Sequence, residues 1–492
     1  MRGNKDTLER SKDMQPVHGS IELAVSADQL WQAFDQPRLW PRWNTCFFWC
    51  ANRRLELGRQ LVWCFEPIRP WYGYKFPAIA KVVELEPGRK VTWEVTALPG
   101  FYARHTYSVE PLPDGRSRFS SCEQAYGWGF RVLRKFWLSH FTFVKDRSLS
   151  GARQLEIRHL AGDRIDGDTL PRRNYFGFLF SIIVWAAWIY GLASLNIATL
   201  IVAIALLAGR LAYAFYDLYV RLDCQRVAPG IHVALNGGGN TLVVEDGDDV
   251  LLVDTKFPPA SHALMRWLRK STLLPVTMTV NTHYHYDHSH GNVLFPNAER
   301  FAFDKAPDFM RARDGAWWSR HAEVLPDRLV SPAGTTIQVG GQQVELLHLG
   351  PGHTHGDLIV RVPKFNVIAT GDLIFNGYYM FFDEGREGVD LMGNVDKLRW
   401  LVAQWPDAIF MPGHGQLARA NDLLRAADFI EDLLKQAKDV RASGGTETDA
   451  VRRIDLRRWN LLILPSFHEG KLAWATKASN AKAAWRLTAS SQ

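Results

Sequence analysis

The feature that most limits how this chain can fold is a run of 35 residues, 175–209, that contains no Asp, Glu, Lys, Arg or His. A membrane-spanning helix needs about 20 apolar residues, so the run exceeds one span and is slightly short of two. The apolar character continues past Arg210, whose long side chain can reach the membrane interface from a helix end. Gly191, Ser194 and Asn196 stand in the middle of the run and favour a reversal of the chain there.

We therefore predict a transmembrane helical hairpin over 174–218, with spans near 174–192 and 196–216. Basic residues flank it on both sides, beginning with Arg172 and Arg173. This charge distribution places both ends of a hairpin, and both flanking soluble domains, in the cytoplasm of a multi-pass membrane protein. Two other arrangements stay open: a buried helical hairpin inside a soluble domain, and one tilted span with the flanking domains on opposite sides.

Composition limits the class of protein. A chain of 492 residues has room for two or three domains, and 47% hydrophobic with 22% charged residues is typical of globular proteins. The net charge of +7 is too small to predict a nucleic-acid partner unless the charges cluster on one face. Five cysteines do not form a disulfide framework in a chain of this size. The first thirty residues lack an apolar core, so we expect no cleaved signal peptide and a reducing compartment.

The region before the apolar run has a defined order of strands and helices. Residues 17–26 predict a strand, and 27–34 predict a helix with Ser26 as N-cap. Five further β-like runs, each ended by a Pro/Gly turn signal, lie at 60–67, 78–88, 90–100, 103–115 and 117–127. Helical periodicity from Phe130 to Leu160 closes the region.

This order, together with the opening sequence SADQLWQAFDQPRLWPRWN, resembles the START-like (polyketide cyclase/SRPBCC) helix-grip family over residues 15–160. The resemblance implies a sheet curved around the last helix and a cavity for an apolar ligand. The aromatic residues available to line it are Trp31, Trp40, Trp43, Trp63, Trp71, Tyr72 and Tyr74. Aromatic side chains in a β-rich region also serve as plain core, so no binding residue is assigned.

After Cys224 the pattern changes to short strands and turns. Residues 240–254 predict a β-hairpin around Asp246-Gly247, residues 262–271 a helix, and residues 276–280 an apolar strand.

The sequence HYHYDH directly follows this strand. Residues two apart on extended chain project to the same side, so His283 and His285 can bind one ion together. Asp287 and His288 fall where the chain turns, and can face a second ion. Imidazole and carboxylate are ligands that Zn²⁺ takes, so the motif predicts a metal site.

Further candidate ligands follow later apolar strands: His353 in PGHTHGD, Asp372 in TGD and His414 in PGHG. Side chains delivered by several strand ends can meet at one rim of a sheet sandwich. Each histidine taken alone could simply satisfy a hydrogen bond. Together they predict a single centre.

These motifs resemble those of the metallo-β-lactamase superfamily over residues 224–490. The resemblance implies an αββα sandwich, and hence an α+β multidomain protein with the helix-grip domain before the hairpin. It further implies that His283, His285 and His353 hold one zinc, that Asp287, His288 and His414 hold the other, and that Asp372 bridges them. Asp254 in LLVDT matches the acid of the family's first motif and is expected to orient ligands. His290 and His355 are interpreted as supporting or exposed residues.

The resemblance implies hydrolysis. Two zinc ions sharing a water lower its pKa toward ~7, which yields a hydroxide nucleophile, and Asp287 is the candidate catalytic residue that steers it or takes its proton. An acid at 372, where some β-lactamases place cysteine, favours an ester, thioester or lactone substrate over an antibiotic. Tyr378, Tyr379 and the FFDEG stretch can line the substrate cleft or only pack.

The three parts together predict a membrane-anchored dinuclear zinc hydrolase of a lipophilic or acylated small molecule met at the lipid bilayer. Iron or manganese are alternative metals. Two other functions stay open: a phosphodiesterase or nuclease of the same superfamily, and a membrane-tethered lipid-binding protein with a non-catalytic metal site. The sequence does not determine the substrate's identity, the ligand of the N-terminal domain or the oligomeric state.

Overall fold

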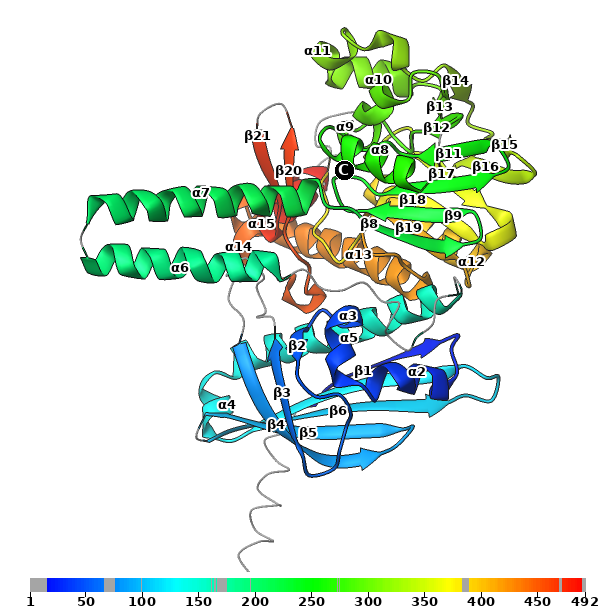
Figure 1. Ribbon diagram of the computed structural model, residues 1–492. Coiled ribbons are helices and arrows are strands. Elements are labelled where there is room, and N and C mark those ends of the chain that lie inside the picture. Colours follow the sequence, from blue (N-terminus) through cyan, green and yellow to red (C-terminus); the bar gives the residue numbers. More distant parts are fainter. Residues whose placement is uncertain are drawn as a thin grey trace, which may run out of the picture. The chain divides into compact units, whose positions relative to one another are not determined.

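The computed structural model describes residues 16–65, 76–98, 100–160, 162, 165, 175–194, 196–271, 273, 275–382, 389–468 and 471–488. The chain divides into two compact units, Met1–Tyr213 and Ala214–Gln492, here called the N-terminal and C-terminal units (Figure 1). Several residues that entered the sequence predictions lie outside the described residues: Trp71, Tyr72, Tyr74, Arg172, Arg173, Asp383, Glu384 and Gly385.

The N-terminal unit contains a seven-stranded antiparallel sheet in the order β1-β7-β6-β5-β4-β3-β2. The strands are β1 Val17–Leu23, β2 Phe47–Cys50, β3 Gln60–Phe65, β4 Phe76–Glu86, β5 Lys90–Leu98, β6 Phe101–Pro111 and β7 Ser117–Tyr126. The six strands predicted from sequence are confirmed, whereas the four-residue strand β2 was not predicted. Its pattern FFWC is too short to show a period.

The helices of this sheet domain are α2 Ala27–Phe34, η1 Pro37–Leu39, α3 Trp40–Trp43, α4 Trp128–Val132 and α5 Arg134–Leu160. Helix α2 begins where predicted, because the Ser26 side chain accepts a hydrogen bond from the Gln29 backbone N–H at 3.3 Å. The predicted closing helix is present as the short α4 followed by the long α5.

Aromatic rings fill the described core of this domain. Trp93 lies 5.2 Å from Trp40 and 5.0 Å from Tyr107 between ring centroids, and Tyr107 lies 5.3 Å from Phe119. The four described tryptophans that were candidates for a cavity lining, Trp31, Trp40, Trp43 and Trp63, are all buried in this core. We therefore assign these four to packing.

Two long apolar helices, α6 Phe176–Ser194 and α7 Ile197–Tyr219, follow. They run side by side in opposite directions (Figure 1). Arg210 Nε donates a hydrogen bond to Ser181 Oγ at 2.9 Å. At the reversal, Asn196 Oδ1 accepts from the Ala198 N–H at 2.9 Å. Within the described part of the chain, these two helices are long and apolar enough to cross a membrane. The two helices predicted from sequence are thus present, and their crossing of a membrane stays a prediction.

The C-terminal unit is built on two facing sheets. A seven-stranded sheet has the order β14-β13-β12-β11-β10-β9-β8, and a five-stranded sheet has the order β15-β16-β17-β18-β19. The strands of the first sheet are β8 Asp223–Ala228, β9 Ile231–Leu235, β10 Thr241–Asp246, β11 Asp249–Val253, β12 Met278–Val280, β13 Glu299–Phe303 and β14 Arg328–Val330. Those of the second are β15 Thr335–Val339, β16 Gln342–His348, β17 Leu358–Val362, β18 Val367–Asn376 and β19 Ile409–Gly415.

Helices cover the outer faces of both sheets. Leu264 and Leu268 of α8 Ala260–Lys270 pack with Leu252 of the first sheet. Helices α12 Leu391–Gln404 and α13 Ala420–Ala442 bury apolar side chains with Ile368 of β18 in a second cluster. The αββα sandwich expected for this region, and with it a two-domain α+β architecture, is observed.

The remaining elements of this unit are short. They are α9 Tyr286–Ser289, η3 His290–Leu294, α10 Ala306–Arg313, α11 Gly315–Trp318, η4 Ala322–Val324, η5 Pro363–Phe365, α14 Glu447–Arg453, η6 Arg457–Trp459, β20 Leu464–His468, β21 Lys471–Ala475 and α15 Lys477–Leu487.

Candidate metal centre

Loops and strand irregularities at one edge of the two sheets carry the predicted metal-ligating residues. The HYHYDH segment leaves β12 and enters the single turn α9, with His285 as its N-cap residue. His353 lies on the connection between β16 and β17. The sequence suggested that Asp372 and His414 follow the ends of strands, but they lie within β18 and β19. The register of this strand pair shifts at Gly371, and the irregularity breaks the regular pleat beside Asp372.

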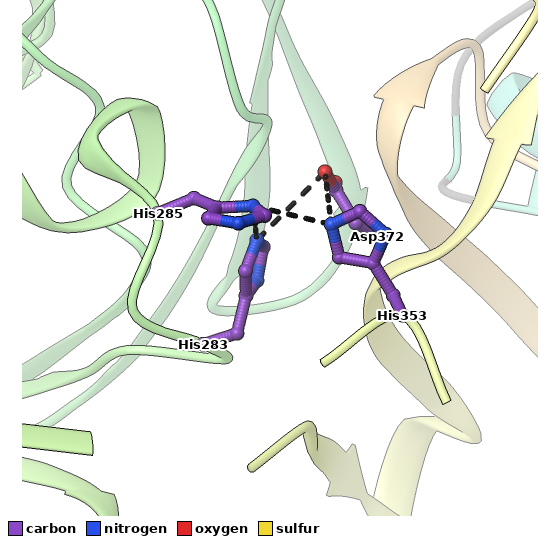
Figure 2. Close-up of side chains that lie close together, drawn as sticks. All are labelled: His283, His285, His353 and Asp372. Carbon is purple, nitrogen blue, oxygen red and sulfur yellow. Dashed lines mark hydrogen bonds and ion pairs between the residues drawn. The ribbon is translucent and has the colours of Figure 1, made fainter. Parts of the chain in front are cut away.

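The seven residues form two groups. The first contains His283, His285, His353 and Asp372, and the second contains Asp287, His288 and His414 (Figure 2 shows the first). Within each group one ligand atom per residue lies within 4.8 Å of the others. This division is the one that the sequence resemblance implies.

Asp372 faces both groups with different oxygens. Its Oδ2 lies 3.4 Å from His353 Nε2 and 3.8 Å from His283 Nε2. Its Oδ1 lies 3.2 Å from His288 Nε2 and 3.5 Å from His414 Nε2. A carboxylate with one oxygen toward each group has the arrangement of a bridging ligand.

The spacing within the first group suits one small cation. His285 Nδ1 lies 3.0 Å from His283 Nε2 and 3.2 Å from His353 Nε2. Nitrogen ligands about 2.0–2.1 Å from a tetrahedral zinc ion are separated by about 3.3 Å. The distances between the imidazole nitrogens are therefore close to those that such an ion requires.

Two buried atoms of the centre face each other as an ion pair without a regular hydrogen bond. His288 Nε2 and Asp372 Oδ1 have no hydrogen-bond partner among the described residues. Burying polar atoms without partners is costly unless another group satisfies them. A cation between the groups would satisfy both atoms, so the residues present fit a metal pair.

The carboxylates and imidazoles of the centre shift each other's pKa. Burial lowers the pKa of His414, but the charges of Asp372 and Asp287 outweigh burial and raise it to about 9. Burial likewise opposes the charged form of Asp372, but His414 and His288 hold its pKa well below the ordinary value. Burial and the neighbouring His288 lower the pKa of His283. The carboxyl group of Asp372 is therefore ionised at neutral pH, which is the form that can bind a metal ion.

Asp254 supports the ligands from behind. Its Oδ2 lies 2.7 Å from His288 Nδ1 and accepts a hydrogen bond from Thr282 Oγ1 at 2.8 Å, while its Oδ1 accepts from the Thr282 N–H at 2.7 Å. Thr282 Oγ1 in turn lies 3.0 Å from His283 Nδ1. One buried carboxylate thus contacts the ring of His288 directly and that of His283 through a threonine, and these are the contacts that a ligand-orienting acid would make.

Lys256 was not singled out from the sequence. It is buried, and its Nζ donates to the carbonyl oxygens of Ala234, Asn236 and Gly239 at 2.9, 2.7 and 2.6 Å. These bonds hold the 236–240 loop against the centre: an ideal Cβ on Gly239 would lie 2.5 Å from Cε1 of His288. A lysine three residues after the buried strand β11, which itself follows a Gly-Gly-Gly-Asn loop, is the only sequence signal for this role.

His290 and His355 lie outside both groups. His290 is buried, with its Nε2 3.3 Å from Asp314 Oδ2 and its ring stacked 4.4 Å from that of Trp317. The ring of His355 lies 5.9 Å from that of Phe309. Neither geometry gives these histidines a ligand position.

A cavity of about 290 Å³ opens onto the centre. Its polar side includes His285, Asp287, Asp372 and His414. Its other lining residues include Tyr219, Tyr378, Phe381, Phe382, Leu464, Pro465 and Ala473. Tyr378 and the first two residues of the FFDEG stretch thus line the cavity, and Tyr379 does not. All four residues also pack against the hydrophobic cluster of α12 and α13.

The fold and the seven-residue centre define a domain of the metallo-β-lactamase class. The family model described as Metallo-beta-lactamase superfamily matches residues 235–428, and the model described as Polyketide cyclase / dehydrase and lipid transport matches residues 14–144. Both family resemblances drawn from the sequence are confirmed.

Individual relatives cover only part of the chain. Acyl-coenzyme A thioesterase MBLAC2 of Bos taurus is 26% identical over 168 residues, 30% of this chain and 60% of that protein. Metallo-beta-lactamase IND-1 of Chryseobacterium indologenes is 27% identical over 173 residues, 35% of this chain and 64% of that protein. A solved metallo-beta-lactamase from Pontibacter korlensis is 20% identical, covers 42% of this chain and 99% of its own, and has a TM-score of 0.35. The chain thus spans less than two thirds of the length of these curated relatives.

Proposed function

We propose that this protein is a dinuclear, zinc-dependent hydrolase that cleaves an ester, thioester or lactone bond of a lipophilic acyl substrate at a membrane. The observation that carries the proposal is the position of Asp372, with one carboxylate oxygen toward each group of histidines. A structural zinc site is closed and uses four ligands around one ion, so it needs no shared acid facing a cavity.

Seven residues are proposed as ligands. His283, His285 and His353 hold one ion, Asp287, His288 and His414 hold the other, and Asp372 bridges. When bound, two such ions supply Lewis-acid polarisation of a carbonyl oxygen and an activated water.

Asp287 is the proposed catalytic residue. Although burial opposes its charged form, His288 and His414 hold its pKa below the ordinary value, so the carboxylate is ionised at neutral pH. Its Oδ2 lies 3.3 Å from His414 Nε2, and the residue also lines the cavity. The Asp287 carboxylate can therefore orient the attacking water and accept a proton from that water.

The apolar side of the cavity supports an acyl substrate. Phe381, Phe382, Leu464, Pro465 and Ala473 also line the cavity and offer hydrocarbon surface to an acyl chain. The similarity to a protein named acyl-coenzyme A thioesterase agrees with a thioester among the candidate bonds.

The helices α6 and α7 are proposed as a membrane hairpin with both units on the cytoplasmic side. Only 17% and 6% of their most apolar windows are buried, which supports lipid rather than a protein core as their surroundings. Alkaline carbonate should therefore fail to extract the protein from membranes. Epitope tags at the two ends should be digested together by protease from one side of sealed vesicles, whereas a single span would separate them.

The hydrolase proposal is tested by elemental analysis of protein purified without chelators, followed by assays on ester, thioester, lactone and phosphodiester substrates. We expect two metal ions per chain and turnover of long-chain acyl substrates above short water-soluble ones. His285→Ala should abolish turnover, whereas His262→Ala, at an exposed position on α8, should not. Metal-loaded wild-type protein that cleaves only phosphodiesters, or nothing in the panel, would contradict the proposal.

A further inference from the structure

The end of the apolar helix α7 forms part of the wall of the metal-centre cavity. Tyr219, the last residue of α7, belongs to the C-terminal unit and lines the cavity. Its side chain packs on Phe257 with ring centroids 5.9 Å apart, and Phe257 packs on Tyr286 at 5.1 Å. Tyr286 stands between two proposed ligands, His285 and Asp287. An aromatic row therefore connects the apolar helix to the segment that carries the metal ligands.

The Tyr219 hydroxyl is buried without a protein partner. The residue is 5% exposed, and its hydroxyl has no hydrogen-bond partner among the described residues. The neighbouring Tyr286 shows the usual arrangement, because its hydroxyl lies 2.7 Å from Ser466 Oγ. Buried phenol hydroxyls normally have a hydrogen-bond partner. A molecule bound in the cavity can provide the partner that the Tyr219 hydroxyl lacks.

The chemistry of this hydroxyl selects the kind of occupant. A phenol with an ordinary pKa of about 10 is protonated at neutral pH and can donate one hydrogen bond. The carboxylates that share the cavity, Asp287 and Asp372, are engaged with His414 and His288. An acceptor oxygen brought in by the substrate is therefore the partner that this donor lacks.

We propose that Tyr219 is a substrate-binding residue whose hydroxyl donates a hydrogen bond to the carbonyl oxygen of an acyl substrate. This inference rests on the proposed function and extends it by naming the substrate contact. An exposed aromatic ring on the same helix adjoins Tyr219. Phe215, one turn earlier on α7 and 43% exposed, lies 4.7 Å from the Tyr219 ring. An acyl chain that remains partly in the bilayer can pack on this ring beside the cavity, so the substrate class is a membrane-dissolved acyl compound.

The test compares two hydroxyl deletions on the same helix, Tyr219→Phe and Tyr216→Phe. Both keep the ring, and Tyr216 is exposed and does not line the cavity. Binding is measured by calorimetry on the zinc-loaded full chain in lipid nanodiscs with two inert probes. One is a ketone analogue of a dodecanoyl thioester, with CH2 in place of sulfur and the carbonyl retained. The other is the matching thioether, which lacks the carbonyl.

We expect Tyr219→Phe to weaken binding of the ketone about five- to tenfold and to leave thioether binding, metal content and the melting temperature unchanged. Tyr216→Phe should bind both probes as the wild type does. Equal ketone binding by Tyr219→Phe and wild type would overturn the inference, because water alone then satisfies the hydroxyl. Parallel loss of both probes, or no ketone binding by the wild type, would also overturn it. If the wild type binds the ketone through Tyr219 but hydrolyses no acyl substrate, the proposed function fails and the binding contact stands.

Discussion

Asp254 Oδ2 lies 2.7 Å from Nδ1 of His288, and both side chains are buried. The carboxylate accepts a hydrogen bond from the Nδ1–H of His288, and Nε2 is the nitrogen that faces Asp372. The pair therefore determines which tautomer His288 presents to a metal ion.

Asp254→Asn is expected to reduce zinc affinity by about 10–100-fold, mainly at the second ion, because the amide holds the imidazole ring weakly and in either tautomer. Asparagine tolerates the positive φ of 65° at this position, so the fold should persist. Competition with a chromophoric chelator measures the affinity. Asp248→Asn, at an exposed position in the β10–β11 turn, is the matched control and should bind zinc normally.

Gly239→Ala is expected to displace His288. The added methyl would lie 2.5–2.7 Å from three atoms of the imidazole ring, closer than real contacts allow. The second metal site should lose at least tenfold in affinity, with less effect on the first. The control Gly315→Ala adds the same methyl where no atom lies within 4 Å. It should bind zinc normally, which would show that the effect at Gly239 comes from the steric clash and not from replacing a glycine as such. Normal zinc binding by Gly239→Ala would show that the loop relaxes instead.

Lys256→Met should destabilise the C-terminal unit by about 3 kcal/mol, because three carbonyl groups lose the ammonium donor inside the protein. The melting temperature should fall by roughly 5–10 °C. Differential scanning calorimetry of the zinc-loaded protein measures this fall, and Lys270→Met on exposed helix surface should show almost none. An unchanged melting temperature would mean that these carbonyls do not depend on the lysine.

Metal-free protein should lose stability between pH 6.5 and 9. Burial lowers the pKa of His414, but Asp372 and Asp287 outweigh burial and raise it from 6.5 to about 9. A pKa that is higher in the folded state stabilises the fold below the unfolded value of 6.5, and this contribution disappears as the pH rises through 9. Melting curves of chelator-treated protein should shift downward by several degrees over this range. His414→Gln should flatten the dependence, and zinc-loaded wild type should lack it because the metal replaces the proton.

Much of the centre was predictable because its signals are local. His283, His285, Asp287 and His288 stand within six residues, and alternation along extended chain indicates which of them share a side. The period of the apolar residues and the turn residues likewise predicted six strands of the N-terminal sheet and the helix α2. Strand β2 and the hairpin β20–β21 were missed because runs of four or five residues do not establish a period.

The sequence by itself determined the two families, the apolar helices and the identity of the candidate ligands, since each depends on residues close together in the chain. Only the tertiary structure decided that the carboxylate of Asp372 has one oxygen for each group, that Lys256 holds the loop against His288, and that Tyr219 reaches the cavity. These relationships join side chains that are distant in sequence, and packing of the two sheets creates them. No local pattern of polarity encodes the direction in which a buried side chain points after that packing.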